Sequence, residues 1–162
     1  MPARASSNKQ AGATTSVSVS SNGEDTLQRR LSLPNDIDTV PQLNAFIDAI
    51  VEERGLDMSL GMNLNLAVEE AVVNVMTYAY PEGTEGQVNI EVTVDSQQVT
   101  FVISDSGRPF DPTAQGDVDT TLSAEERPIG GLGIYLVRQL MDDVRYERAD
   151  GQNILTLCKK VV

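Results

Sequence analysis

The apolar residues of this chain change their spacing once, and that change restricts the fold more than any other feature. Within Val40–Arg54 and Met58–Tyr78 they recur every three or four positions, which predicts two consecutive helices with one apolar side each. Within Gln87–Val94 and Gln98–Ser104 they alternate with polar residues, which predicts a β-hairpin. The apolar sides of helices and strands are buried by packing against one another. Two helices followed by a hairpin therefore favour a fold in which helices form a layer on a sheet.

The remaining segments add one helix and three strands. Leu27–Leu33 alternates as a strand, and Leu132–Met141 has helical spacing. Val144–Arg148 and Asn153–Lys159 lie on either side of a short turn, which predicts a second hairpin. From this order we expect an α+β fold, a two-layer α/β sandwich in which a mainly antiparallel sheet carries the helices on one face.

Two segments lack this periodicity. Residues 1–24 consist mostly of Ser, Thr, Ala, Gly and Asn, which predicts a flexible tail with one weak strand at Thr15–Val19, followed by a single domain over residues 25–162. Ser106–Gly130 contains three prolines and three glycines. Loops of this length are uncommon in compact domains and are usually functional or disordered.

Composition excludes several classes of function. The net charge of −12 opposes contact with nucleic acid, and a phosphate ligand would need a cation or backbone amides. The absence of histidine excludes histidine-based catalytic triads, most zinc sites and a histidine phosphoacceptor on this chain. The single cysteine, Cys158, excludes an intramolecular disulfide. No apolar run approaches the about 20 residues that cross a membrane, and no apolar segment follows Arg4 and Lys9, so we expect a cytoplasmic protein.

An acid and an amide lie one turn apart in the second predicted helix. Glu70 and Asn74 share a face that also holds Leu66 and Val73. One interpretation is a polar stripe at the edge of the core, in which Glu70 accepts a hydrogen bond from Asn74. The other is a site for a hard cation, because an amide oxygen can bind Mg²⁺ and a nearby carboxylate can take a proton from a nucleophile.

Two further stretches have features of a ligand site. Asp105 follows an apolar strand directly, and Gly107 and Pro109 then turn the chain. A carboxylate at the end of a buried strand can accept a hydrogen bond from an exocyclic amine, although the same residues also favour an ordinary turn. Glycines cluster at the start of the helix that follows Arg127. Free N–H groups at such a start suit a phosphate, and the alternative is a flexible entry loop.

The three stretches together resemble one family. The segments "AVEEAVVNVMTYAY", "SDSGRPFDP" and "GGLGIYLVRQLMDDVRYE" are similar to the N box and the two glycine boxes of the Bergerat-fold (GHKL) ATPases. That superfamily contains DNA gyrase, the large heat-shock chaperones, histidine kinases and MutL. Within it the segments most resemble the anti-sigma-factor serine/threonine kinases of the RsbW and SpoIIAB type. The resemblance extends from about Leu27 to Lys160.

The resemblance implies a role for each of these residues. Glu70 would be the general base, Asn74 would be the Mg²⁺ ligand next to the ATP phosphates, and Asp105 would receive the adenine amino group. Ser106–Gly130 would form the ATP lid. The other implied nucleotide contacts are Gly107, Pro109, Arg127, Gly130, Gly131, Leu132 and Gly133.

The sequence departs from the family pattern at three positions. Tyr78 stands where these kinases often have a histidine, and Pro109 stands where many members of the superfamily have a second glycine. Asn153 lies near the position of a threonine that commonly contacts the adenine. This last difference leaves the polar contact from the final strand open.

The resemblance implies a kinase that uses ATP and Mg²⁺ and phosphorylates a STAS-domain anti-anti-sigma protein. A sigma factor would be a second partner, and such proteins commonly form homodimers. Neither nucleic acid nor a membrane is expected as a partner. Two alternatives stay open, namely a module that binds ATP and sequesters a partner without phosphorylating it, and the ATPase domain of a split histidine kinase.

Overall fold

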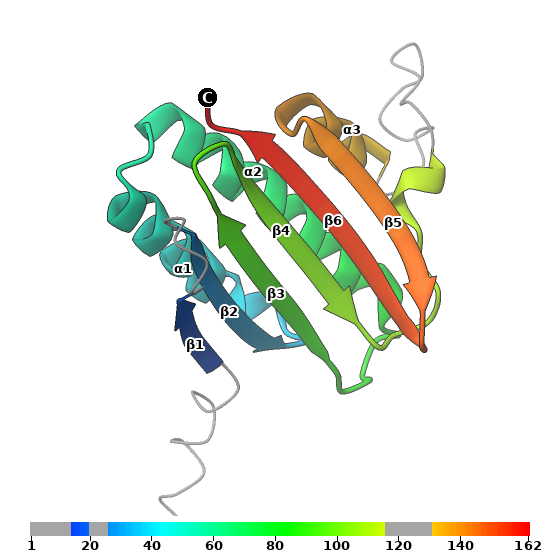
Figure 1. The fold of residues 1–162 in the computed structure, drawn as a ribbon. Coiled ribbons are helices and arrows are strands. Elements are labelled where there is room, and N and C mark those ends of the chain that lie inside the picture. Colours follow the sequence, from blue (N-terminus) through cyan, green and yellow to red (C-terminus); the bar gives the residue numbers. More distant parts are fainter. Residues whose placement is uncertain (1–13, 20–25, 116–130) are drawn as a thin grey trace, which may run out of the picture.

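The computed structural model describes residues 14–19, 26–115 and 131–162 of the protein. The strands of these residues form one antiparallel sheet in the order β1-β2-β3-β4-β6-β5 (Figure 1). Their bounds are β1 Thr14–Val19, β2 Leu27–Pro34, β3 Gln87–Val94, β4 Gln98–Asp105, β5 Asp143–Ala149 and β6 Gln152–Lys160.

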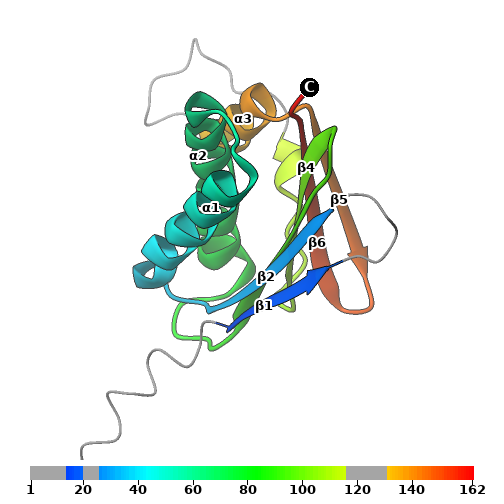
Figure 2. The same ribbon diagram turned by 60° about the vertical axis from the view of Figure 1, so that its left-hand side comes forward.

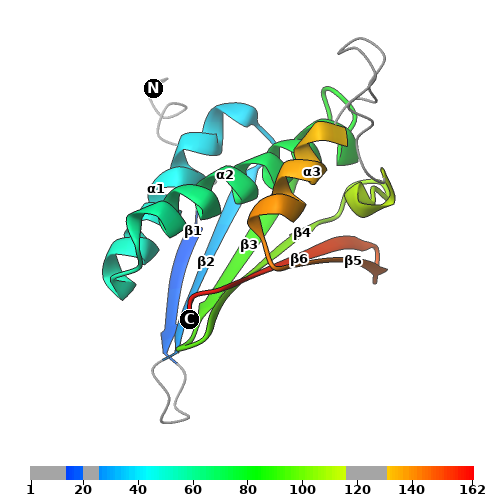
Figure 3. The same ribbon diagram turned by 90° about the horizontal axis from the view of Figure 1, so that it is seen from above.

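The helices of the described residues all lie on one face of this sheet. They are α1 (Val40–Arg54), α2 (Met58–Asn74) and α3 (Gly131–Leu140), with α2 between the other two (Figure 2, Figure 3). The first two helices connect β2 to β3, and α3 precedes β5. This arrangement confirms the predicted two-layer α+β sandwich.

The core lies between the helices and the sheet. Each central strand buries alternate side chains, so Ile103 and Asp105 of β4 face the helices, whereas Ser104 faces the open side of the sheet. The largest fully buried side chains come from all three helices and four of the strands; they are Leu33, Leu43, Ile47, Leu64, Ile90, Phe101, Ile103, Ile134 and Leu157.

The N-terminal segment contributes to the sheet. The strand expected near Thr15–Val19 is present as β1, which pairs with β2 from Thr14 opposite Ser32 to Val19 opposite Leu27. These six residues, which lie within the segment predicted as a tail, therefore form an edge strand of the sheet. Residues 1–13 and 20–25 lie outside the described residues. In the part of the chain that is described, no helix has the length and apolar character needed to cross a membrane.

The first two helices cover their predicted ranges, but the last turn of the second is not α-helical. The α-helix α2 ends at Asn74, and the chain continues as a π-helical turn, Val75–Ala79. In this turn the carbonyl oxygens of Tyr78 and Ala79 accept hydrogen bonds from Nε and from the backbone N–H of Arg108, each at 2.8 Å. The donors come from the loop after β4, so the end of the helix depends on residues distant in sequence. Such π turns are frequent at functional sites.

Candidate functional site

The end of β4 holds a buried carboxylate. Asp105 is 1% exposed, and its Oδ1 accepts hydrogen bonds from Nδ2 of Asn153 and from the backbone N–H of Gly107, both at 2.9 Å. Its Oδ2 is buried and has no hydrogen-bond partner among the described residues. A buried acceptor without a donor is costly, so this oxygen marks a place for a donor on a ligand. We refer to Asp105, Gly107 and Asn153 as the strand-end cluster.

The environment of Asp105 affects its charge. Burial raises the pKa of this carboxyl above its usual value of 3.8, because the charged form loses hydration. The hydrogen bonds from Asn153 and Gly107 and the positive charge of Arg148 act in the opposite direction without cancelling the increase. A donor that reached Oδ2 would favour the ionised form. The site therefore suits a group that donates a hydrogen bond to Oδ2, such as an amine on an aromatic ring.

Asn153 positions both the acid and the loop that follows it. This residue lies on β6 directly opposite Asp105 in the strand pairing. Its Nδ2 also donates to the carbonyl oxygen of Arg108 at 2.8 Å, and its Oδ1 accepts from the backbone N–H of Phe110 at 3.0 Å and from the hydroxyl of Tyr146 at 2.6 Å. The sequence left open which polar contact the final strand makes. In the structure Asn153 bonds to Asp105 and to the loop that follows it.

The strand-end cluster is joined to the turn that follows α2. Gly107 lies so close to Ala79 that a Cβ atom would collide with the Ala79 carbonyl oxygen, which accounts for a glycine here. The backbone N–H of Ser106 donates to the hydroxyl of Tyr80 at 3.0 Å, and that hydroxyl donates to the carbonyl oxygen of Gln87 at 2.8 Å. The end of the helix that carries the amide is thereby fixed beside the buried acid.

Sequence reasoning missed three residues that hold this junction, namely Tyr80, Arg108 and Arg148. Nη1 of Arg148 donates to the carbonyl oxygen of Gly107 at 2.8 Å, which adds a bond from β5 to the loop. The contacts of Tyr80 and Arg148 depend on strand pairing, for which the sequence carries no local signal. Arg108 offered one signal, because it directly follows Gly107 in a motif that was already singled out.

Glu70 and Asn74, which we refer to as the helix pair, lie on α2 before the π turn. Asn74 is 8% exposed, and Glu70 is half-buried. Neither side chain forms a hydrogen bond with any described residue, so the bond from Asn74 to Glu70 that one interpretation required is absent from this part of the chain. An amide oxygen and a carboxylate in this state can bind a cation or accept a proton.

The next predicted contacts are the glycines at the start of α3. Gly131, Leu132 and Gly133 form the first turn of α3, which packs against α2. Backbone N–H groups in a first helical turn have no partner within the helix and can bind an anion. Of the other predicted contacts, Pro109 is exposed in the loop after β4. Arg127 and Gly130 lie outside the described residues, together with the expected lid beyond residue 115.

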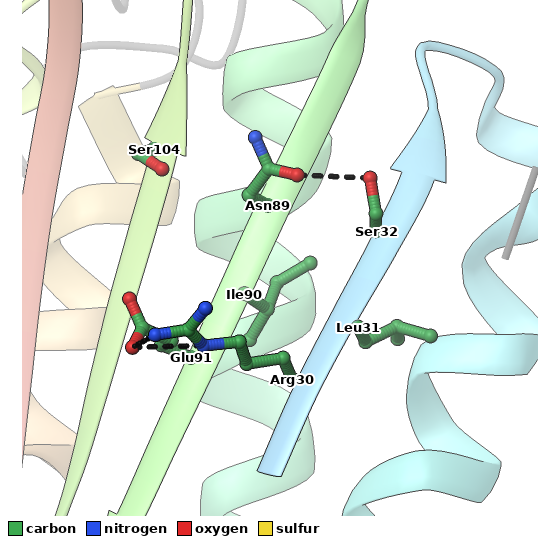
Figure 4. Close-up of a pocket in the computed structure, with 7 residues that line it drawn as sticks. All are labelled: Arg30, Leu31, Ser32, Asn89, Ile90, Glu91 and Ser104. Carbon is green, nitrogen blue, oxygen red and sulfur yellow. Dashed lines mark hydrogen bonds and ion pairs between the residues drawn. The ribbon is translucent and has the colours of Figure 1, made fainter. Parts of the chain in front are cut away.

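A hollow on the open face of the sheet does not belong to this site. It has a volume of about 320 Å³ and lies over β2, β3 and β4 (Figure 4). Four of the polar side chains that line it already pair with one another, since the hydroxyl of Ser32 donates to Oδ1 of Asn89 at 2.8 Å and Arg30 contacts Glu91 at 2.9 Å. No predicted ligand residue lines it. The candidate site is therefore the strand-end cluster with the helix pair, on the opposite side of the sheet.

Comparison with known proteins identifies a family and several relatives. The family described as "Histidine kinase-like ATPase domain" matches residues 33–159, a range that contains every predicted site residue. The serine-protein kinase RsbW of Listeria monocytogenes is 28% identical over 129 residues, which span 77% of this chain and 82% of that protein.

Other relatives have similar names. The serine/threonine-protein kinase BtrW of Bordetella bronchiseptica is 31% identical over 98 residues, which span 60% of this chain and 69% of that protein. Among solved structures, a Mycobacterium tuberculosis protein with RsbU and RsbW domains has a TM-score of 0.58 at 16% identity, with 82% of this chain and 32% of that chain covered. At this identity the structural likeness concerns the fold alone.

Proposed function

The chain belongs to the family of histidine kinase-like ATPase domains, and on this premise we propose that it is an ATP-dependent serine/threonine protein kinase of the RsbW type. The observation that carries the proposal is Oδ2 of Asp105, a buried carboxylate oxygen without a partner among the described residues. It lies at the strand end where this family would receive the adenine amino group. Gly107, Pro109 and the first turn of α3 would complete the nucleotide site, together with Arg127 and Gly130.

The helix pair would serve the phosphates. Asn74 would offer its amide oxygen to a magnesium ion that ATP brings with it. When bound, such an ion neutralises charge on the triphosphate and on the transferring group. The need for a cation is consistent with the acidity of the chain, whose net charge is −12. The N–H groups at the start of α3 would add further positive potential without adding a basic side chain.

Glu70 would act as the general base. It takes the proton from the hydroxyl of a serine or threonine in the partner, and the hydroxyl oxygen forms a bond to the γ-phosphorus of ATP. The bond between that phosphorus and the oxygen that bridges to the β-phosphate breaks, and ADP leaves. Most of the rate enhancement in such transfers comes from positioning and charge stabilisation. By family resemblance the acceptor would be a STAS-domain anti-anti-sigma protein, and a sigma factor would be a second partner.

Label transfer tests this proposal. The full chain is incubated with γ-labelled ATP, Mg²⁺ and a purified STAS-domain protein from the same organism, and we expect label on that protein. Glu70→Ala should lower the rate by about 10²–10⁴-fold, because a positioned base contributes that much. Calorimetry should show unchanged ATP affinity for this variant. Transfer that persists unchanged in Glu70→Ala would rule out the base, and partner binding without any transfer would favour a sequestering module.

A further inference from the structure

Three large apolar side chains form a row on the outer surface of α2. Met58, Met62 and Leu66 are 81%, 70% and 42% exposed, and each follows the previous one by four residues. Residues at this spacing are neighbours on a helix surface. Scattered apolar residues are ordinary on a surface, whereas a contiguous row marks a contact area. We refer to these three residues as the apolar row.

The apolar row leads directly to the helix pair. Glu70 is the next residue at the same spacing after Leu66, and Asn74 follows it one turn later. With a rise of about 1.5 Å per residue, the row and Glu70 together extend over about 18 Å of helix. A protein surface that covered Leu66 would therefore bring its own atoms within reach of the proposed base.

The charge around the row restricts what can bind there. From Val40 to Ala79 the chain carries six carboxylates and a single arginine. Two of the carboxylates lie beside the row, because Asp57 caps the start of α2 and Glu69 follows Leu66 by three residues. An acidic border of this kind repels acidic surfaces and favours a basic one. Methionine side chains are flexible and adapt to a partner of irregular shape.

We propose that the apolar row is the docking surface for the protein whose hydroxyl is phosphorylated. The partner presents apolar side chains flanked by lysine or arginine next to its acceptor serine or threonine. The apolar contacts provide affinity, and the basic residues lie against Asp57 and Glu69. This inference rests on the proposed kinase function and adds to it the face of the molecule from which the acceptor approaches.

The test is a double variant, Met62→Gln with Leu66→Gln, measured with a purified STAS-domain protein from the same organism as acceptor. Glutamine keeps the length of the side chain and the helical preference while removing the apolar surface. We expect KM for the acceptor to rise about 10-fold or more, as for loss of apolar anchors at an interface. The affinity for ATP should not change. KM within twofold of the parent would overturn the inference and leave the kinase proposal intact.

A matched control separates this surface from another exposed apolar residue. Ile37 is 54% exposed and lines a hollow with Met76 and Thr77 near the other end of α2. Ile37→Gln should leave KM for the acceptor within twofold. A large increase for Ile37→Gln with none for the double variant would move the docking surface to that hollow and overturn the inference.

The salt dependence and a binding assay complete the design. KM should increase with added NaCl, and this increase should be smaller in Glu69→Gln, because one charge of the acidic border is removed.

If the parent binds the STAS-domain protein but transfers no phosphate, the dissociation constant replaces KM. A double variant that then binds weakly supports the docking surface although the kinase proposal fails. No binding by the parent, or equal binding by the double variant, overturns the inference.

Discussion

The strand-end cluster and the helix pair are two polar regions at the edge of one core, and they are held in different ways. In the cluster, Asn153 bonds to Asp105 and to the loop after β4, and only Oδ2 of Asp105 lacks a partner among the described residues. The helix pair has no side-chain hydrogen bond within that part of the chain. Fixed partners determine geometry before a ligand binds, whereas free groups are limited only by their rotamers.

The difference suggests that the two regions have different roles in the proposed nucleotide site. The adenine end would be preorganised by bonds between strands, and the phosphate end would take its geometry from the nucleotide and its cation. Preorganisation of a buried acid has a cost, because burial raises the pKa of Asp105 and the charged form is less stable there than in water. The buried acid that would bind the adenine is therefore expected to lower the free energy of unfolding.

The largest expected effect concerns the helix pair. Asn74→Ala should lower the rate of phosphoryl transfer by roughly 100-fold or more, because it removes the proposed ligand of the cation. The free energy of unfolding should fall by no more than about 1 kcal/mol, since no side-chain hydrogen bond is lost. Label transfer and urea unfolding measure the two effects. Asn63→Ala on the same helix is the control and should change neither.

The same variant distinguishes the two regions. Asn74→Ala should weaken ATP binding in the presence of Mg²⁺ and leave binding in EDTA unchanged. A variant of Asp105 should weaken both equally. If Asn74→Ala bound ATP with Mg²⁺ as tightly as the parent does, the helix pair would have no part in cation binding.

The next effect concerns the stability of the cluster. Asn153→Leu should lower the free energy of unfolding by about 3 kcal/mol, because buried donors and acceptors are left without partners. Asn153→Asp should show a pH dependence, since it places a second carboxylate beside Asp105 and raises the pKa of the pair further. Its stability should be greatest at acidic pH and decrease as pH rises through the folded-state pKa. A loss below about 1 kcal/mol for Asn153→Leu would contradict a positioning role.

The fold was predictable because its signals are local. Helical spacing, with Gly55 as the stop, predicted the bounds of Val40–Arg54, and Gly55 ends this helix with a φ of 63°, the left-handed conformation that glycine adopts without strain. The helix predicted to end near Tyr78 extends to Ala79, but the π form of its last turn, Val75–Ala79, was not predicted. Its π turn depends on donors from Arg108, thirty residues beyond Tyr78, and no pattern within the helix reports them.

The candidate site was predictable in part, for the same reason. Asp105 could be placed at a strand end because its strand alternates visibly up to that residue. The position of Asn153 opposite Asp105 required the register between β4 and β6, which the sequence of neither strand determines. The collision that requires glycine at position 107 likewise involves Ala79, a residue on another element.

Asp105→Asn should separate function from stability. ATP affinity should fall about 10- to 150-fold, as for loss of a hydrogen bond to a charged group. The free energy of unfolding at pH 7 should be no lower than that of the parent. The folded-state pKa of Asp105 is raised, so its contribution to stability is greatest below the usual value of 3.8 and is lost as pH rises through the folded pKa. The asparagine variant lacks that loss.

Calorimetry with ATP and urea unfolding between about pH 3.5 and 7 measure both parts of this prediction. The gain of the variant over the parent should grow with pH across this window. Ser104→Ala, one residue earlier and facing the open side of the sheet, is the control for both measurements. If Asp105→Asn bound ATP like the parent, Asp105 would have no part in the proposed site. If its stability relative to the parent decreased as pH rises, the acid would stabilise the fold.

The smallest effect concerns the link between the two regions. Arg108→Gln removes the bond from Nε to the Tyr78 carbonyl oxygen and a positive charge at the end of a helix, but it keeps the backbone bond to Ala79. We expect a loss of about 1 kcal/mol in urea unfolding, because the side chain is exposed. Arg145→Gln is the control, since its exposed ion pair with Asp143 should contribute about 0.5 kcal/mol or less. If both losses were equal, the arginine would act only as surface charge, and the junction would depend on Gly107 and the backbone alone.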